Sequence, residues 1–400
     1  MNLLIDYETY GQTMQMTHEF FCKFSKKYKN GLKAKKSYSI NRIDIEWADI
    51  VLSIRPTNII STWIAEECRR CNKIHISMYD DNLLNHLRTD RYMVRRKNEL
   101  GNIIRKSQIL LTTNNLLTSL LQKIHPEIRT AHIDTVVDEK CIKQTKKQTE
   151  KTALKLVYYS NDGTTHYFES FMPEVIKKIV AKLPDTQIQL DLIGVQHVNF
   201  NLGKCEIHYV PHMGYSDFKN YLKNGDYIAG ISPIVIGDNF SKYKYFNKFI
   251  EYTCAGIVGI YTNAEPYTFE IVDGQNGFLC DNNIDSWTNC IIRLFESPTE
   301  RYTMLKNAYK TLEEKHSFDS VARRLLIGIP ELIGYQSPKK KVRSLFWIKT
   351  RYSFFYIGEK INATVRYLKN GGVKSFFNRT NQYIHTMAQI AKERKNAVAE

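Results

Sequence analysis

The stretch "FNKFIEYTCAGIVGIYTNAEPYTFEIVDGQNGFL", from Phe246 to Leu279, predicts a short helix, a small-residue turn and a buried strand. Lys248 and Glu251 lie three positions apart near the helix start, where the helix dipole attracts anions. A phosphate could bind the first-turn amides together with Lys244 or Lys248. The Glu251 carboxylate could then accept hydrogen bonds from the two ribose hydroxyls of a nucleoside diphosphate. A solvated surface ion pair is the alternative interpretation.

Short apolar segments alternate with helical segments on both sides of this stretch. Such alternation is typical of an α/β protein with parallel sheets covered on both faces. We therefore predict two Rossmann-like domains that face a cleft, followed by a basic tail. The predicted parts are an acceptor-side domain (1–137), a lysine-rich linker (138–153), a donor domain (154–330) and a basic, aromatic helical tail (331–400).

In open parallel sheets, ligands bind beyond the carboxyl ends of the strands. In the first domain, Asp80 and Asp81 follow the strand "KIHISMY" and Arg55 ends the strand "IVLSI". The two carboxylates could orient an acceptor hydroxyl or act as a base, and the alternative is that one of them caps the following helix. Gly11 and His18 lie in the loop and helix after the first strand, on the acceptor side. An ordinary helix histidine is the alternative for His18.

Composition limits the class of protein. The chain is 43% hydrophobic and 12% aromatic, which supports folded domains, and it contains no apolar run of about 18 residues. It also lacks a recognisable secretory signal, so we predict a soluble, cytoplasmic protein. Its eight cysteines are dispersed, and the "CRRC" pair, Cys68 and Cys71, has no nearby metal-ligand partners. We therefore predict reduced thiols and no metal site.

The positive charge is concentrated near the end of the chain. Of 57 Lys/Arg and 41 Asp/Glu, 14 and 3 lie between Gln336 and Glu400, where they are interleaved with Phe, Trp and Tyr. Three interpretations stay open. The tail could make a peripheral contact with the inner face of the plasma membrane through residues 336–400, or form helices that pack on the domains. Nucleic-acid binding is the interpretation that we favour least.

The order of motifs in the second domain resembles the nucleotide-sugar-binding half of glycosyltransferase family 4, which has the GT-B fold. The shared elements are "IAGISP", "KFIEY", "CAG", "IVGIY", "EPYTFEIV" and "DGQNGFL". The resemblance is clear over residues 155–325 and mainly architectural over residues 1–137. It implies a sugar transferase that uses a nucleoside-diphosphate sugar as donor, without a metal or another cofactor, and with retention of anomeric configuration.

The resemblance also implies roles for residues of the donor domain. Glu251 matches the glutamate that holds the donor ribose, whereas Lys248 and Lys244 match basic positions close to the diphosphate. Glu270 matches a position that either contacts the donor or packs at a helix start. Two departures matter. Tyr243 stands where many members carry a second glutamate, and the loop "NDGTTH" offers Gly163 and His166 in place of an Arg/Lys pair.

Together these observations predict a glycosyltransferase that acts on a glycan or lipid-linked acceptor in surface polysaccharide biosynthesis. One alternative is a GT-B-type nucleotide-sugar epimerase or phosphorylase. The other is a non-catalytic basic scaffold or nucleic-acid-binding protein that uses the tail.

Overall fold

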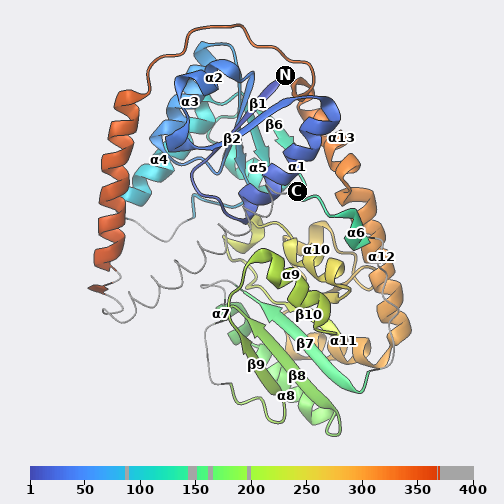
Figure 1. Cartoon of the computed structure of the whole chain (residues 1–400). Helices are drawn as coiled ribbons and strands as arrows, with labels where there is room; N and C mark the ends of the chain where they lie inside the picture. The colour runs from blue at the N-terminus through green and yellow to red at the C-terminus, as the bar shows by residue number, and fades with distance from the viewer. Residues whose placement is uncertain (86–89, 143–150, 161–164, 196–199, 367, 370–400) are drawn as a thin grey trace. The chain divides into compact units, whose positions relative to one another are not determined.

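The computed structural model describes residues 1–85, 90–142, 151–160, 165–195, 200–366 and 368–369 (Figure 1). The chain forms two compact units: unit 1 comprises Met1–Asp134 with Val321–Glu400, and unit 2 comprises Thr135–Ser320. Each unit contains a six-stranded sheet in which neighbouring strands run parallel. The predicted α/β class with parallel sheets is therefore confirmed.

The sheet of unit 1 has the strand order β2-β1-β3-β4-β5-β6. Its strands are β1 (Asn2–Tyr7), β2 (Gly31–Lys36), β3 (Ile50–Ile54), β4 (Ile74–Tyr79), β5 (Ile109–Thr112) and β6 (Arg129–His132). Its helices before residue 134 are α1 (Gln12–Tyr28), α2 (Arg42–Trp47), α3 (Ile59–Arg70), α4 (Arg91–Lys106) and α5 (Asn115–Gln122), with the 3-10 helix η1 (Ser37–Ser39).

The sheet of unit 2 has the order β12-β11-β10-β7-β8-β9. Its strands are β7 (Ala153–Tyr159), β8 (Gln187–Ile193), β9 (Glu206–Val210), β10 (Ala229–Ser232), β11 (Val258–Thr262) and β12 (Phe278–Cys280). Its helices are α6 (Glu139–Ile142), α7 (Thr165–Glu169), α8 (Met172–Lys182), α9 (Tyr215–Asn224), α10 (Asn247–Ala255), α11 (Ile284–Glu296) and α12 (Pro298–His316), with the 3-10 helices η2 (Ser241–Tyr243) and η3 (Tyr267–Phe269).

Both faces of the second sheet are buried. Leu156 and Tyr158 of β7 belong to a core cluster that includes Trp287 of α11, whereas the intervening Val157 belongs to the cluster that includes Phe249 of α10. Alternate residues of a strand point to opposite faces, so helices cover both sides of this sheet. This explains why the inner strands β10 and β11 are mostly apolar, whereas β9 at the edge of the sheet is not.

The chain returns to unit 1 within α13 (Phe318–Gly328), and the 3-10 helix η4 (Pro330–Leu332) follows. Residues 346–366 then form one further helix, which we call the tail helix. Figure 1 shows it beside α3 and α4. Leu345 and Tyr352 are buried in a cluster with Trp63 of α3, so the described part of the tail packs on unit 1. No helix among the described residues is long and apolar enough to cross a membrane.

Candidate functional site

Helix α10 is held against its sheet by close packing at a glycine. A Cβ atom on Gly230 of β10 would lie 2.6 Å from atoms of the Tyr252 ring, so the ring occupies the space of a side chain. The Tyr252 hydroxyl donates to the carbonyl of Ile231 over 3.0 Å. Gly256 then ends the helix in the left-handed region, at φ 79°, where glycine is favoured. These contacts fix the position of α10 relative to the carboxyl ends of the strands.

Glu251 projects from α10 toward the end of β7. Its side chain is buried and accepts a hydrogen bond from the hydroxyl of Tyr159, the last residue of β7. The Nζ atom of Lys248 lies 4.5 Å from the ring centroid of Tyr158 and 4.7 Å from that of Tyr159. Burial and the nearby charge of Lys244 lower the pKa of Lys248 to about 7, against the opposing effect of Glu251. The predicted Lys248–Glu251 pair is therefore half-enclosed by tyrosines and is not a solvated surface pair.

The loop that leads into α10 is ordered by a carboxylate. Asp238 accepts hydrogen bonds from the Tyr167 hydroxyl and, over 2.7 Å, from the Ser241 hydroxyl. Although burial opposes it, this hydrogen bonding lowers the pKa of Asp238 to about 2. Lys244 follows, with its Nζ atom 4.5 Å from the Phe240 ring centroid. The N-cap residue of α10, Phe246, contributes no side-chain hydrogen bond to the first-turn amides.

The remaining residues predicted to bind the donor are Tyr243, Glu270 and Gly163, and their surroundings differ from those of Glu251. Tyr243 is half-buried, and the Nζ atom of Lys242 lies 5.1 Å from its ring centroid. Glu270 is buried against α12, where a carboxylate oxygen lies 3.0 Å from the Nζ atom of Lys315. The structure thus gives Glu270 a packing contact with another helix. Gly163 falls outside the described residues.

In unit 1 the structure brings three predicted residues together. Nη2 of Arg55 donates to Asp80 over 2.8 Å and to Asp81 over 2.6 Å. Arg55 has the left-handed φ of 47°, uncommon for a residue with a side chain, and its amide donates to the carbonyl of Met78. Burial alone would lower the pKa of Arg55, but the two carboxylates raise it. Thr13 also donates to Asp80 over 2.7 Å, so helix α1 is tied to this group.

The alternative interpretation, in which Asp80 or Asp81 caps the next helix, is contradicted for helix α4. Helix α4 begins at Arg91, and its N-cap is Asp90, whose carboxylate accepts from the amides of the first turn. Both carboxylates accept hydrogen bonds from Arg55.

Gly11 and His18 make no described contact with Arg55, Asp80 or Asp81. Gly11 is the N-cap of α1, and a Cβ atom there would meet nothing within 4 Å. His18 lies one turn from Cys22, with 3.6 Å between Nε2 and Sγ, and burial lowers the pKa of His18. This placement agrees with the alternative of an ordinary helix histidine.

The sequence analysis did not identify the buried polar side chains around Asp6, near the carboxyl end of β1 in unit 1. Asp6 is buried and accepts from Ser37, Ser53 and Ser61 over 2.5, 2.7 and 2.7 Å. Burial raises the pKa of Asp6, although the three hydroxyls oppose this. The single signal was an aspartate within the otherwise apolar segment "NLLIDY". Tyr159 was missed as well, since a tyrosine at a strand end carries no motif.

Among the residues that the structure describes, no group of three or more His, Cys, Asp and Glu side chains is placed to hold a metal ion. Cys68 and Cys71 of the "CRRC" pair are free thiols buried in the core of unit 1.

Solved structures with a similar fold provide a comparison. S. aureus TarM, solved with fondaparinux, α-GlcNAc-glycerol and UDP, has 14% identity and a TM-score of 0.52 over 70% of this chain and 55% of TarM. Anabaena HepE in complex with UDP and glucose has 9% identity and a TM-score of 0.58 over 83% of this chain and all of HepE. Sucrose-phosphate synthase from Thermosynechococcus elongatus has 12% identity and a TM-score of 0.56 over 83% of this chain and 98% of the synthase.

This chain therefore spans little more than half the length of TarM. No protein-family model and no curated protein matches the sequence. At these identities the likeness shows the fold, which is GT-B, as the sequence predicted. Membership of glycosyltransferase family 4 stays a prediction.

Proposed function

We propose that this protein transfers a sugar from a nucleoside-diphosphate sugar to a glycan or lipid-linked acceptor. The observation that carries the proposal is the geometry of α10. A buried carboxylate, Glu251, and a lysine, Lys248, lie beside the carboxyl end of a parallel strand, at the start of a helix whose first-turn amides have no side-chain cap. Structures of similar fold were solved with UDP, which is the class of ligand that this geometry suits.

Each donor group would then meet a matching side chain of unit 2. Glu251 accepts hydrogen bonds from the two ribose hydroxyls, while Lys248, Lys244 and the first-turn amides of α10 bind the diphosphate. The bond between the anomeric carbon and the diphosphate oxygen breaks, and the amides and lysines stabilise the negative charge that develops on the leaving group. We propose that this charge stabilisation needs no metal ion.

The acceptor is proposed to bind the Arg55–Asp80–Asp81 group of unit 1. The acceptor hydroxyl oxygen forms the new bond to the anomeric carbon and gives its proton to a base. Asp80 and Asp81 are both candidates for this base, because their carboxylates lie together beyond the end of β4. Arg55 positions both carboxylates and is thus a positioning residue, and Gly11 leaves open space beside the loop that precedes α1.

The biological setting that fits this reaction is surface polysaccharide assembly on the inner face of the plasma membrane. A nucleotide-sugar epimerase or phosphorylase is the alternative within the fold. An epimerase would convert the donor sugar without any acceptor, and a phosphorylase would require inorganic phosphate.

Donor binding is the first test. Saturation-transfer NMR and calorimetry with a panel of nucleoside-diphosphate sugars should identify at least one donor. Glu251→Gln should weaken its binding by about 10- to 100-fold, since the amide carries no charge and keeps a single acceptor oxygen for the two ribose hydroxyls. Glu313→Gln, a matched change at an exposed position of α12, should leave the affinity unchanged. If no donor binds, or if Glu251→Gln binds as well as the wild type, the proposed site is wrong.

A further inference from the structure

The tail helix has two apolar faces, and one of them is accounted for by packing. Its inner face contacts unit 1 through Tyr352, which donates to Glu8 over 3.1 Å, and Phe355, whose ring centroid lies 5.3 Å from that of Tyr92. Glu359 on the same face pairs with Arg96, with 2.7 Å between Nη2 and Oε2. These contacts dock the helix and set which side turns outward.

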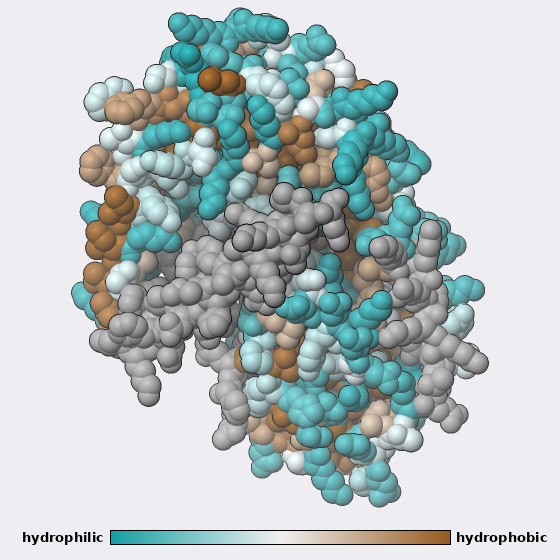
Figure 2. All heavy atoms as spheres, in the orientation of Figure 1, coloured by the Kyte–Doolittle hydropathy of each residue, from teal (hydrophilic) through white to brown (hydrophobic). Residues whose placement is uncertain are grey.

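The outer face carries large apolar side chains that stay largely exposed among the residues that the structure describes. Trp347, Phe354 and Ile361 are seven residues apart, so they lie on one side of the helix, and their exposed fractions are 74%, 75% and 59%. Exposed residues of the same face extend this row at Ile357, Val365 and Leu368. We call these six residues the apolar stripe. Figure 2 shows apolar side chains gathered along this helix, at the left edge of the view.

Within the tail segment itself, nearly all charges have one sign. Residues 336–369 contain nine Lys/Arg, and their single acidic residue is Glu359, which points inward to Arg96. At 100° per residue, Arg351 falls on one flank of the stripe and Lys360 on the other. Both are exposed. The outward side of the tail helix is thus an apolar row bordered by cations.

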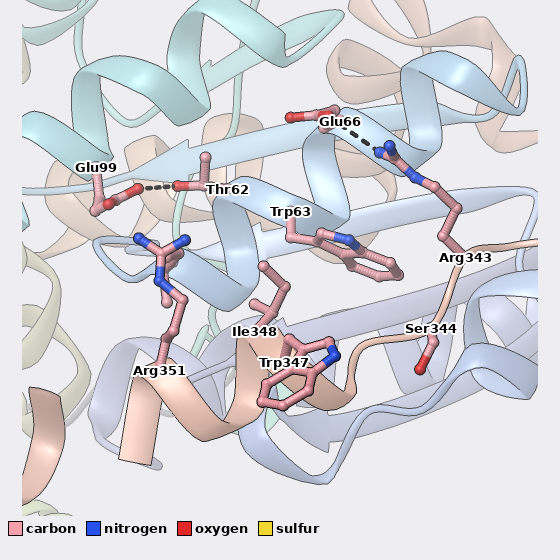
Figure 3. A pocket seen from close by; sticks show the side chains of 10 residues that line it. Thr62, Trp63, Glu66, Glu99, Arg343, Ser344, Trp347, Ile348 and Arg351 are labelled. Carbon is pink, nitrogen blue, oxygen red and sulfur yellow. Dashed lines mark hydrogen bonds and ion pairs between the residues drawn. The ribbon is translucent and has the colours of Figure 1, made fainter. Parts of the chain in front are cut away.

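A pocket at the start of the tail helix adds to this surface (Figure 3). It has a volume of about 510 Å³ and lies between the tail helix and helices α3 and α4. Trp347 lies at its edge, between Arg343, which pairs with Glu66 over 3.0 Å, and Arg351, which points toward Glu99. An exposed indole is therefore flanked by two guanidinium groups at this end of the stripe.

We propose that the apolar stripe is a docking surface for an anionic lipid bilayer. An interfacial helix places Trp, Phe and Ile among the acyl chains near the headgroups, while flanking Lys and Arg contact the anionic phosphates. A second copy of the chain fits less well, because a symmetric contact would bring two cationic faces together.

The test is co-sedimentation of the full chain with vesicles. We expect binding to vesicles of phosphatidylcholine mixed with phosphatidylglycerol, weaker binding to phosphatidylcholine alone, and a loss of binding with added salt. The triple variant Trp347→Ser, Phe354→Ser, Ile361→Ser should bind about 100-fold more weakly, because three interfacial side chains are removed. The matched control Ile43→Ser, Ile327→Ser changes two exposed apolar residues outside the tail and should bind like the wild type.

Three results would overturn the proposal. The first is the absence of wild-type binding to anionic vesicles. The second is unchanged binding of the triple variant, which would place any attachment elsewhere in the chain. The third is a wild-type protein that is a dimer while the triple variant is a monomer, which would assign the stripe to contact with a second copy of the chain.

A second measurement covers the case in which the triple variant fails to fold. Brominated lipids should quench the wild-type tryptophan fluorescence, and the single variant Trp347→Phe should bind vesicles while losing that quenching. Quenching that persists in Trp347→Phe would refute insertion of the stripe.

Discussion

The low pKa of Lys248 makes donor binding depend on pH in a defined direction. Because this pKa is about 7, the side chain is largely neutral at pH 8.5 and largely charged at pH 6.5. A bound diphosphate favours the charged form, so binding above pH 7 must take up a proton. The affinity for a nucleoside-diphosphate sugar should therefore fall as the pH rises through 7.

The size of the effect follows from linkage. If diphosphate binding raises the pKa of Lys248 to about 9, the dissociation constant should rise about 20-fold between pH 6.5 and pH 8.5, or about 1.8 kcal/mol. A nucleoside-diphosphate sugar is the suitable probe, since its doubly esterified diphosphate does not titrate in this range. Isothermal calorimetry at five pH values, in buffers of different ionisation enthalpy, measures both the affinity and the proton uptake.

Two variants isolate the lysine. Lys248→Arg keeps a positive charge at every pH and should give a flat profile. Cys141→Ser controls for a second group that titrates in the same range, since the hydrogen bond with Cys254 of α10 lowers the pKa of Cys141 to about 7. This control should retain the slope of the wild type. A flat wild-type profile, or a slope that persists in Lys248→Arg, would refute the assignment.

Three further predictions concern the supports of the two units. Tyr159→Phe removes the hydrogen bond to Glu251 and should raise the donor dissociation constant about 5- to 10-fold by calorimetry, with no added effect in a Glu251→Ala background. Since the folded pKa of Asp6 is raised, the unfolding free energy should fall as the pH rises through that pKa, by up to about 1.4 kcal/mol per pH unit; urea titrations of Asp6→Asn should lack this slope. Arg96→Ala removes the cation that pairs with the half-buried Glu8, which keeps its hydrogen bond from Tyr352, and should lower the unfolding free energy by about 1.5–3 kcal/mol, measured by urea denaturation; a loss below 1 kcal/mol would contradict this.

Local sequence patterns predicted most of the secondary structure but not its edges. Strand β2, "GLKAKK", lacks an apolar pattern because it lies at the edge of its sheet, and β12 has three residues. The segment "FESFMPEVIKKIVAKL" has a continuous helical pattern, but it is divided between two helices, α7 and α8, because Pro173 lies in the first turn of α8 and favours a helix start there.

The sequence by itself determined the α/β class and the chemistry available at α10, because a strand, a helix start and a glycine turn are local features. Only the tertiary structure decided which distant residues meet. The pairing of Arg55 with Asp80 and Asp81 depends on the parallel register of β3 and β4, which no local pattern specifies. Likewise, the basic and aromatic composition of the tail left three interpretations open. Packing on unit 1 determined which face of the tail helix is buried and which is exposed, since burial depends on contacts with residues far away in the sequence.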